Sequence, residues 1–305
     1  MTRRARRAQP APSDPAAVER RARAADRRDD ARRRKVELLL DRFFRPHNWA
    51  VRIAYALRLQ GGPPSEVDRQ ALAVPRENDA PPLTIAFASD FRAGATTDAR
   101  VIAEACDALD SLRPDVLLLG GDFVSVRASD IHALAAMLAR IRAPLGKFAV
   151  LGNHDLRSDS STVSKALEAA GVRVLENEVI RLAAPHHDVA IIGLDDPIRG
   201  KPDGEILDDV AGVRIVLMHA PDGLLAIGDR DFDLALCGHT HGGQIALPGG
   251  TMPYLPSGKL SRVYAKGLYR LGTDEDETLI VSRGVGCSTL PFRVWCRSQV
   301  HVITL

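Results

Sequence analysis

Six short apolar runs are the feature that most constrains how this chain folds, because each has the length and the aliphatic composition of a strand buried on both faces. They are LTIAFAS (83–89), DVLLLG (115–120), KFAVLG (147–152), VAIIGL (189–194), VRIVLMH (213–219) and DLALCG (233–238). Helical patterns occupy three successive intervals between them, at 98–112, 129–140 and 161–170, the last with Ser161 as its N-cap. Strands that alternate with helices predict an α/β fold.

The C-terminal part of the chain has a different pattern, with short strands and no helical periodicity. Its apolar runs are AKGLYRLG (265–272), ETLIVSRG (277–284) and SQVHVITL (298–305). We expect these three segments to be antiparallel strands that complete a second sheet.

The first 35 residues differ in composition from the rest of the chain. They carry thirteen Lys/Arg and five Asp/Glu, a net charge of +8; because the whole 305-residue chain has +2, the remaining 270 residues have −6. Residues 1–34 contain almost nothing apolar and cannot bury enough surface to offset the entropy of ordering. We therefore expect an Arg-rich disordered tail at 1–35. A basic run is more often a solvated tail than a binding element, so nucleic-acid binding is not expected.

A short amphipathic helix follows the tail. Its apolar side chains are spaced i, i+3, i+4, i+7 and i+8, and they are Val36, Leu39, Leu40, Phe43 and Phe44. Pro46 limits the helix, and Arg42 and Arg45 lie beside the apolar stripe. The stripe fits peripheral contact of residues 36–58 with an anionic membrane. Packing on the body of the protein and cover by a partner are the alternatives.

A linker separates this helix from the regular strand pattern. The segment GGPPSEVDRQ (61–70) has the Gly, Pro and polar composition of such a linker. We therefore divide the chain into a tail at 1–35, an amphipathic helix and linker at 36–82, and a main domain at 83–305.

The apolar runs and the cysteines indicate in which cellular compartment we expect the protein. No run approaches the ~20 residues of a transmembrane helix, and the paired arginines near the start are not followed by a hydrophobic segment of an export signal. The four cysteines, Cys106, Cys237, Cys287 and Cys296, show no metal-ligand spacing. We expect a cytoplasmic protein with reduced thiols, peripheral to the inner face of the membrane if the helix binds lipid. A Cys287–Cys296 disulfide is the alternative.

Polar side chains follow five of the six apolar runs, at the point where each strand ends. They are Asp90, Asp122, Asn153 with His154 and Asp155, His219, and His239 with His241. Because sites in open α/β sheets form at the carboxyl ends of strands, we expect these side chains to converge. Carboxylate oxygens, an amide oxygen and imidazoles together suit Mn, Fe or Zn. Taken singly, each residue has an ordinary alternative, such as a turn residue for Asn153 or an N-cap for Asp155.

The ordered set SDFRAG, GGD, GNHD, H and GHTHGGQ resembles the calcineurin-like metallophosphoesterase superfamily. The segment LCGHTHGGQIALP, with SRGVGCSTLPFR after it, resembles a bacterial subgroup of membrane-associated phosphoesterases and UDP-diacylglucosamine hydrolases. The resemblance extends over about residues 83–305 and implies two mixed β-sheets packed face to face with flanking helices. It also implies hydrolysis of a phosphate monoester, diester or pyrophosphate by a metal-activated hydroxide.

The resemblance further implies a role for each of these side chains. One divalent transition metal ion would be held by Asp90, Asp122 and His241. The other would be held by Asp122, Asn153, His219 and His239, with Asp122 as the bridge. His154 would stabilise the phosphoryl oxygens or protonate the leaving group, and Asp155 would orient His154. Two cations ~3.5–4 Å apart stabilise the attacking and the leaving oxygen of an in-line displacement.

Arg92 departs from the family pattern, which has a histidine ligand of the first metal at this position. A guanidinium cannot deprotonate in a protein and so cannot coordinate. Its charge at ~5 Å would repel a dication by roughly 6 kcal/mol at an effective ε of ~20. Three interpretations remain open. In the first, Arg92 binds the phosphate through its guanidinium group, which is well suited to this contact. In the second, the site still holds two metals, and the first has an extra water ligand. In the third, the protein keeps the metallophosphoesterase fold and binds phosphorylated ligands without catalysis.

The motifs do not identify the substrate. The resemblance points to a phosphorylated small molecule or a lipid-linked substrate. The Gly- and Pro-rich loop 242–262 follows the GHTH motif directly, which favours a specificity loop over the metals, with a surface connection as the alternative. Arg283 and Arg293 flank GVGCSTLPF and are further candidates for phosphate contact. The rival function is a catalytically impaired protein that binds phosphorylated ligands or tethers to anionic lipid or nucleic acid.

Overall fold

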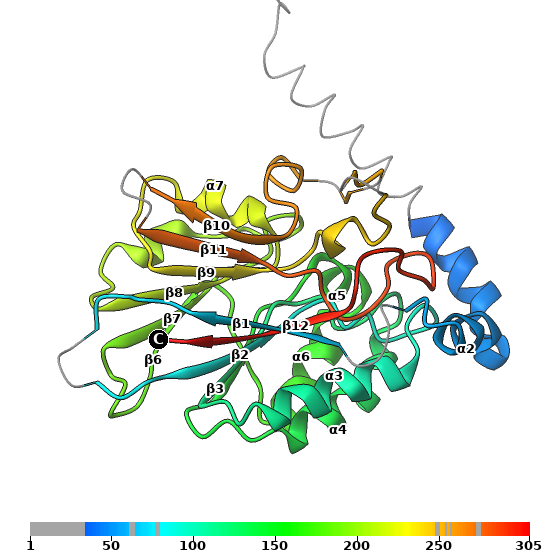
Figure 1. Ribbon diagram of the computed structural model, residues 1–305, viewed down its shortest axis with the longest axis horizontal. Coiled ribbons are helices and arrows are strands. Elements are labelled where there is room, and N and C mark those ends of the chain that lie inside the picture. Colours follow the sequence, from blue (N-terminus) through cyan, green and yellow to red (C-terminus); the bar gives the residue numbers. More distant parts are fainter. Residues whose placement is uncertain are drawn as a thin grey trace, which may run out of the picture.

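The apolar runs form the centre of two β-sheets that pack face to face (Figure 1). The computed structural model describes residues 34–60, 65–76, 80–247, 251–253, 255–256, 258–272 and 276–305. Within these residues each sheet has six strands, and helices flank them. The predicted α/β fold of two mixed sheets with flanking helices is confirmed. The predicted tail at 1–35 lies outside the described residues except for 34 and 35, which are helical.

The first sheet contains the strands that end at Asp90, Asp122 and Asn153. Its order is β1 (Glu66–Ala71), β12 (Gln299–Thr304), β2 (Thr84–Ala88), β3 (Val116–Leu119), β4 (Lys147–Ala149) and β5 (Arg173–Val174). Strand β12 is antiparallel to β2, and the other neighbours are parallel. Strands β2, β3 and β4 therefore end at the same edge of the sheet.

The second sheet contains the strands that end at the three remaining histidines. Its order is β10 (Gly267–Leu271), β11 (Glu277–Val281), β9 (Leu234–Cys237), β8 (Val213–Leu217), β7 (Val189–Gly193) and β6 (Glu178–Arg181). The outer pairs β10–β11 and β6–β7 are antiparallel, and the pairs between them are parallel.

Two predictions about the sheets were wrong. Residues 66–71, which were assigned to a linker, form β1 and pair along their whole length with β12. Strand β12 joins the first sheet, although the sequence placed it in the second. The physical reason is burial on both faces: Val300 packs under the helices while Ile303 packs between the sheets, and a position inside the first sheet provides both environments.

Side chains alternate between two apolar layers along the central strands. Ile85 and Phe87 of β2 point into the layer between the sheets, where they meet side chains of the second sheet. Ala86 and Ala88 face the other way, against the helices. This period of two is what a pleated strand imposes, and it explains why the runs are apolar at every position.

Helices cover the outer faces of both sheets. They are α3 (Ala99–Ser111), α4 (Ile131–Arg140), α5 (Asn153–Ser158), α6 (Ser160–Ala169) and α7 (Leu224–Ile227), with 3₁₀ turns η2 (Ala128–Asp130), η3 (Gly204–Leu207), η4 (Pro221–Gly223) and η5 (His241–Gly243). The three predicted helices are present as α3, α4 and α6. The N-cap of α6 is Asp159, whose carboxylate accepts a hydrogen bond from Thr162 N, and not Ser161. An aspartate is as good an N-cap as serine, which is why the pattern did not separate them.

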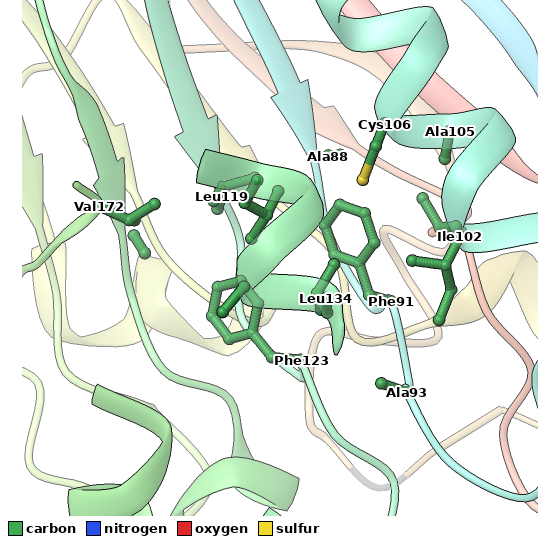
Figure 2. Packing of buried hydrophobic residues seen from close by; sticks show 14 of the residues in the cluster. Ala88, Phe91, Ala93, Ile102, Ala105, Cys106, Leu119, Phe123, Leu134 and Val172 are labelled. Atoms are coloured by element: carbon green, nitrogen blue, oxygen red, sulfur yellow. The ribbon is translucent and has the colours of Figure 1, made fainter. Parts of the chain in front are cut away.

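Two phenylalanines anchor the loops that follow β2 and β3. Phe91 and Phe123 come directly after Asp90 and Asp122, and their rings stack with centroids 6.3 Å apart. Figure 2 shows Phe91 beside Cys106 of α3 and Phe123 near Leu134 of α4. Because both rings are fully buried, the adjacent carboxylates are held at fixed positions.

The N-terminal helices lie at one end of the molecule (Figure 1, blue). Residues 34–44 are helical, followed by η1 (Pro46–Asn48) and α2 (Trp49–Ala56). The predicted stripe is divided, since Leu40 and Phe44 pack with Ala50 and Ala95 while Val36, Leu39 and Phe43 remain exposed. Within the described residues, no helix combines the length and the apolarity that crossing a lipid bilayer requires.

Candidate metal centre

Five strand ends meet between the two sheets and bring the predicted polar side chains together. The loops after β2, β3 and β4 come from one sheet, and those after β8 and β9 come from the other. Asp90, Asp122, His239 and His241 have positive φ angles of 54°, 54°, 69° and 51°. Non-glycine residues rarely adopt this conformation, and they cluster in it where a site dictates side-chain direction.

Three potential ligand atoms surround Nε2 of His219, which is itself the fourth. Asn153 Oδ1 lies 3.2 Å from this nitrogen, His239 Nδ1 lies 3.2 Å from it, and Asp122 Oδ1 lies 3.5 Å from it. Ligand atoms at 2.0–2.1 Å in tetrahedral coordination are about 3.3–3.4 Å apart, so these separations fit one metal ion. We call this set the His219 position.

The tautomer of His219 suits metal binding. Its Nδ1 is 2.8 Å from the Gly120 carbonyl, which can only accept, so in the neutral ring Nδ1 carries the proton and Nε2 offers its lone pair. Gly152 gives the ring room: a Cβ there would lie 2.4 Å from Asp122 Oδ1 and 2.7 Å from His219 Cε1. The glycine of the GNHD motif is therefore required by the close approach of two ligands.

A second group of potential ligands lies beside the first. Asp90, Asp122 and His241 each offer one ligand atom, and these atoms lie within 4.8 Å of one another. Asp90 Oδ1 is 3.4 Å from His241 Nε2, and Asp90 Oδ2 accepts a hydrogen bond from His239 N at 3.0 Å. We call this set the Asp90 position. It contains the three residues that the resemblance assigns to the first metal.

The buried charges at the centre are strongly coupled. Burial disfavours the charged form of His219, but Asp122 and Asp90 outweigh burial and raise its pKa to about 9. Burial would also raise the pKa of Asp122, yet the charges of His219, His154 and Arg92 hold that pKa below its ordinary value. Burial, reinforced by Asp122, raises the pKa of Asp90. A cation between these carboxylates would relieve the repulsion that acts on Asp90.

His154 and Asp155 have separate structural partners. His154 Nδ1 lies 2.7 Å from the Ser125 carbonyl, and its backbone N–H donates to Asp122 Oδ1 at 2.8 Å. The Asp155 carboxylate accepts hydrogen bonds from Gly152 N and Val124 N. That Asp155 orients His154 stays a prediction. Its carboxylate ties together the loops after β3 and β4, where burial raises its pKa to about 7.

Arg92 is buried at the centre with 1% of its surface exposed. Its Nη1 lies 2.9 Å from Asp122 Oδ2, and its Nη2 lies 2.8 Å from Ser288 Oγ. The guanidinium therefore does not swing out toward solvent, and it occupies the side of Asp122 that faces away from His219.

Two residues at the centre were missed by sequence reasoning. Arg157 lies on α5 within 2.7 Å of His154 Nδ1, and it forms an ion pair with Glu37 of the helix 34–44. The i, i+3 spacing of His154 and Arg157 on a helix could have revealed the first contact. Nothing in the sequence connects Glu37 with a histidine more than a hundred residues away.

Arg283 and Arg293, the two arginines that flank GVGCSTLPF, have different partners. Arg283 Nη2 forms an ion pair with Glu66 of β1 at 2.8 Å. Arg293 is buried, with Nη2 2.9 Å from the Arg283 carbonyl and 3.4 Å from His241 Nδ1. The Arg293 guanidinium thus lies beside the Nδ1 edge of the His241 ring.

The centre opens into a cleft of about 1400 Å³. Its floor includes Asp122, Asn153, His154, His239 and His241. Its walls include Val36, Pro197, Ile198, Leu225, Ile245 and Leu290. The described residues of the loop 242–262 contribute Gly243, Gln244, Ile245, Pro256, Gly258 and Lys259 to the lining, as expected of a loop that borders the site.

Comparison with known proteins agrees with this geometry. The family model of the calcineurin-like phosphoesterases matches residues 83–243. Phosphodiesterase YaeI of Escherichia coli is 31% identical over 244 residues, covering 79% of this chain and 88% of that protein. The uncharacterized metallophosphoesterase YkuE of Bacillus subtilis is 35% identical over 205 residues, covering 65% of this chain and 70% of that protein.

A solved structure is similar at greater distance. The 5'-nucleotidase precursor of Thermus thermophilus is 16% identical, with a TM-score of 0.43, covering 73% of this chain and 55% of that one. This likeness is too remote to bear on function. The predicted superfamily is nevertheless confirmed by the family match and by the two sequence relatives, and this chain belongs to the calcineurin-like phosphoesterase family.

Proposed function

We propose that this chain hydrolyses phosphate esters with a divalent transition metal ion, Mn, Fe or Zn, bound by Asp122, Asn153, His219 and His239. The observation that carries the proposal is the His219 position. Three ligand atoms lie 3.2–3.5 Å from His219 Nε2, whose partner nitrogen is fixed as a donor to a backbone carbonyl. An imidazole nitrogen, an amide oxygen and a carboxylate oxygen form a donor set that suits these metals.

The side chains of the centre have distinct tasks in this proposal. When bound, the metal ion acts as a Lewis acid toward a phosphoryl oxygen and lowers the pKa of water. The Gly120 carbonyl holds the ring of His219 in place through Nδ1. The ring of His154 lies at the floor of the cleft, where it exchanges a proton with the leaving group. Asp155 fixes the backbone from which His154 projects.

A phosphodiester that carries an apolar substituent is the substrate class we favour. The E. coli relative is named a phosphodiesterase, which supports a diester. The cleft combines the polar floor with apolar walls that include Ile198, Leu225 and Leu290, and these suit the apolar part of a small-molecule or lipid-linked ester.

Contact with an anionic lipid surface, on the cytoplasmic side, is part of the proposal. The exposed apolar side chains of the N-terminal helices include Leu38, Leu39, Phe43, Trp49, Ile53 and Leu57. Arg42, Arg52 and Arg58 are exposed among them. Apolar groups beside cationic ones match an anionic bilayer. All four cysteines are buried thiols, which supports a reducing compartment.

Hydrolysis assays with bis(p-nitrophenyl) phosphate and p-nitrophenyl phosphate test the function. We expect Mn²⁺-dependent turnover, higher on the diester, that EDTA abolishes and metal restores. His219→Ala is expected to lose bound metal and turnover together, whereas His132→Ala, an exposed histidine on α4, keeps both. Metal-loaded protein without turnover on any phosphate ester would instead favour the binding-only rival.

A further inference from the structure

We infer that the Asp90 position of this centre is filled by the protein itself, through the guanidinium of Arg92, and that the chain binds a single metal ion. The inference rests on the proposed function, because it concerns the neighbouring half of the same site. Its starting point is that the residues present fit a metal at the His219 position and do not fit one at the Asp90 position.

The two carboxylate oxygens of Asp122 face different cations. Oδ1 lies toward His219 Nε2, at 3.5 Å. Oδ2 is 2.9 Å from Arg92 Nη1. A carboxylate that bridges two metal ions through both oxygens would give one oxygen to each ion. Here a guanidinium, which carries a permanent charge and has no lone pair to offer, takes that oxygen.

Arg92 is held in this orientation by protein partners on its other side. Its Nη2 donates to Ser288 Oγ at 2.8 Å, and the backbone N–H of Ser288 donates to Gln244 Oε1. Gln244 Nε2 in turn donates to the carbonyls of Leu290 and Phe292 at 3.0 Å. The arginine is therefore positioned by a hydrogen-bonded chain that reaches the loops after β9 and β11.

His241, the remaining ligand of the Asp90 position, is also turned toward protein partners. Arg293 Nη2, which donates to the carbonyls of Arg283 and Gly286, lies 3.4 Å from His241 Nδ1 and brings a second fixed positive charge beside this ring. His241 Nε2 faces Asp90 Oδ1 at 3.4 Å. These long contacts are weak, and they add to the evidence from Arg92 and Asp122.

Arg92 keeps donors for a ligand, because a guanidinium has five N–H groups and Asp122 and Ser288 accept from two of them. Its Nε is buried and has no hydrogen-bond partner within the described residues, and the side chain borders the cleft. A tetrahedral oxyanion such as phosphate accepts two parallel hydrogen bonds from a guanidinium. The fixed charge of Arg92 would thus balance charge on the phosphoryl oxygens that a second metal balances in a dinuclear centre.

Metal stoichiometry is the first test. Protein that has been saturated with Mn²⁺ and freed of excess is analysed by inductively coupled plasma mass spectrometry. We expect one ion per chain in the wild type and about two in Arg92→His, which supplies a ligand and removes the charge. Arg199→Ala, a change at another arginine that lines the cleft, should leave the value at one. Two ions in the wild type, or one in Arg92→His, would overturn the inference.

Phosphate binding to metal-free protein is the second test. We expect inorganic phosphate to bind the wild type in calorimetry and to bind Arg92→Lys at least tenfold more weakly, because lysine lacks the paired donors. Arg92→Lys keeps a positive charge beside Asp122, so it is a safer variant for folding than Arg92→Ala. Equal affinity in both proteins would remove the role of Arg92 toward phosphate.

The outcomes separate the two proposals. Protein that takes up no metal at all would contradict the proposed function. Protein that takes up two ions and hydrolyses phosphate esters would leave the proposed function intact and overturn only the single-metal inference.

Discussion

Asp122 contacts three other residues of the candidate centre: His154, His219 and Arg92. One of its oxygens accepts the backbone N–H of His154 at 2.8 Å and faces His219, and the other binds Arg92. Its own φ of 54° and the buried ring of Phe123 that follows it fix this orientation. A single carboxylate thus contacts the candidate metal ligand His219, the candidate proton donor His154, and Arg92, which departs from the family pattern.

The first prediction at this scale concerns His154. His154→Ala should retain metal, because the ring is not among the four atoms of the His219 position, and should lose about 10²–10⁴ in kcat, the usual range for acid–base catalysis. Metal analysis beside steady-state kinetics on the diester checks this. If the variant is purified without metal, His154 is a ligand and its assigned role is wrong.

At the scale of elements, strand β12 links the N-terminal part of the chain to the centre of the first sheet. It pairs with β1 on one side and β2 on the other, and its His301 is fully buried beside the ring of Phe87 and 3.6 Å from Asp68. Both ring nitrogens of His301 lack a hydrogen-bond partner within the described residues. Burial lowers the pKa of His301 to about 4, against the opposing effect of Asp68.

This pKa predicts acid sensitivity of the fold. The folded pKa lies below the ordinary value of 6.5, so between pH 6.5 and 4 the unfolded chain binds more protons. The contribution of His301 is present above pH 6.5 and is lost as pH falls through that window, by up to about 3 kcal/mol.

Urea denaturation of wild type and His301→Phe from pH 7.5 to 4.5 measures the effect. We expect the free energy of unfolding of the wild type to fall more steeply than that of the variant. His132→Phe serves as a control at an exposed histidine. Parallel profiles for wild type and His301→Phe would show that His301 does not titrate across this range.

Some positions in these elements could be predicted from the sequence, and others could not. Asp90, Asp122 and Asn153 were predictable as neighbours, because parallel strands bring their carboxyl ends to one edge. The place of β12 was not, since it depends on pairing Gln299–Thr304 with residues more than two hundred positions away. The partner of Arg92 was not predictable either, because Ser288 approaches it from a loop whose path is fixed by tertiary packing.

At the scale of the whole molecule, the N-terminal helices connect the cleft with an exposed apolar surface. Glu37 pairs with Arg157 beside His154, and Val36 lines the cleft. On the same helix Leu39 and Phe43 are 67% and 60% exposed. A lipid surface that met these side chains would lie close to the cleft in which we propose that an apolar ester binds.

Vesicle co-sedimentation tests this surface. Phe43→Glu should lower binding to vesicles that contain anionic phospholipid by roughly tenfold, because it removes buried apolar area and adds a repelled charge. Leu268→Glu, on strand β10 at a distance from α2 (Figure 1), should have little effect. Wild-type protein that does not sediment with anionic vesicles, or equal losses in both variants, would count against lipid contact at this face.

Titration of metal-free enzyme with Mn²⁺, followed by hydrolysis of bis(p-nitrophenyl) phosphate, tests the central claim most directly. If the His219 position holds the catalytic metal and Arg92 fills its neighbour, activity should rise linearly with added ion and level off at one equivalent per chain. Absence of turnover at every metal loading, or full turnover in the presence of EDTA, would contradict the assignment of this chain as a metal-dependent phosphoesterase.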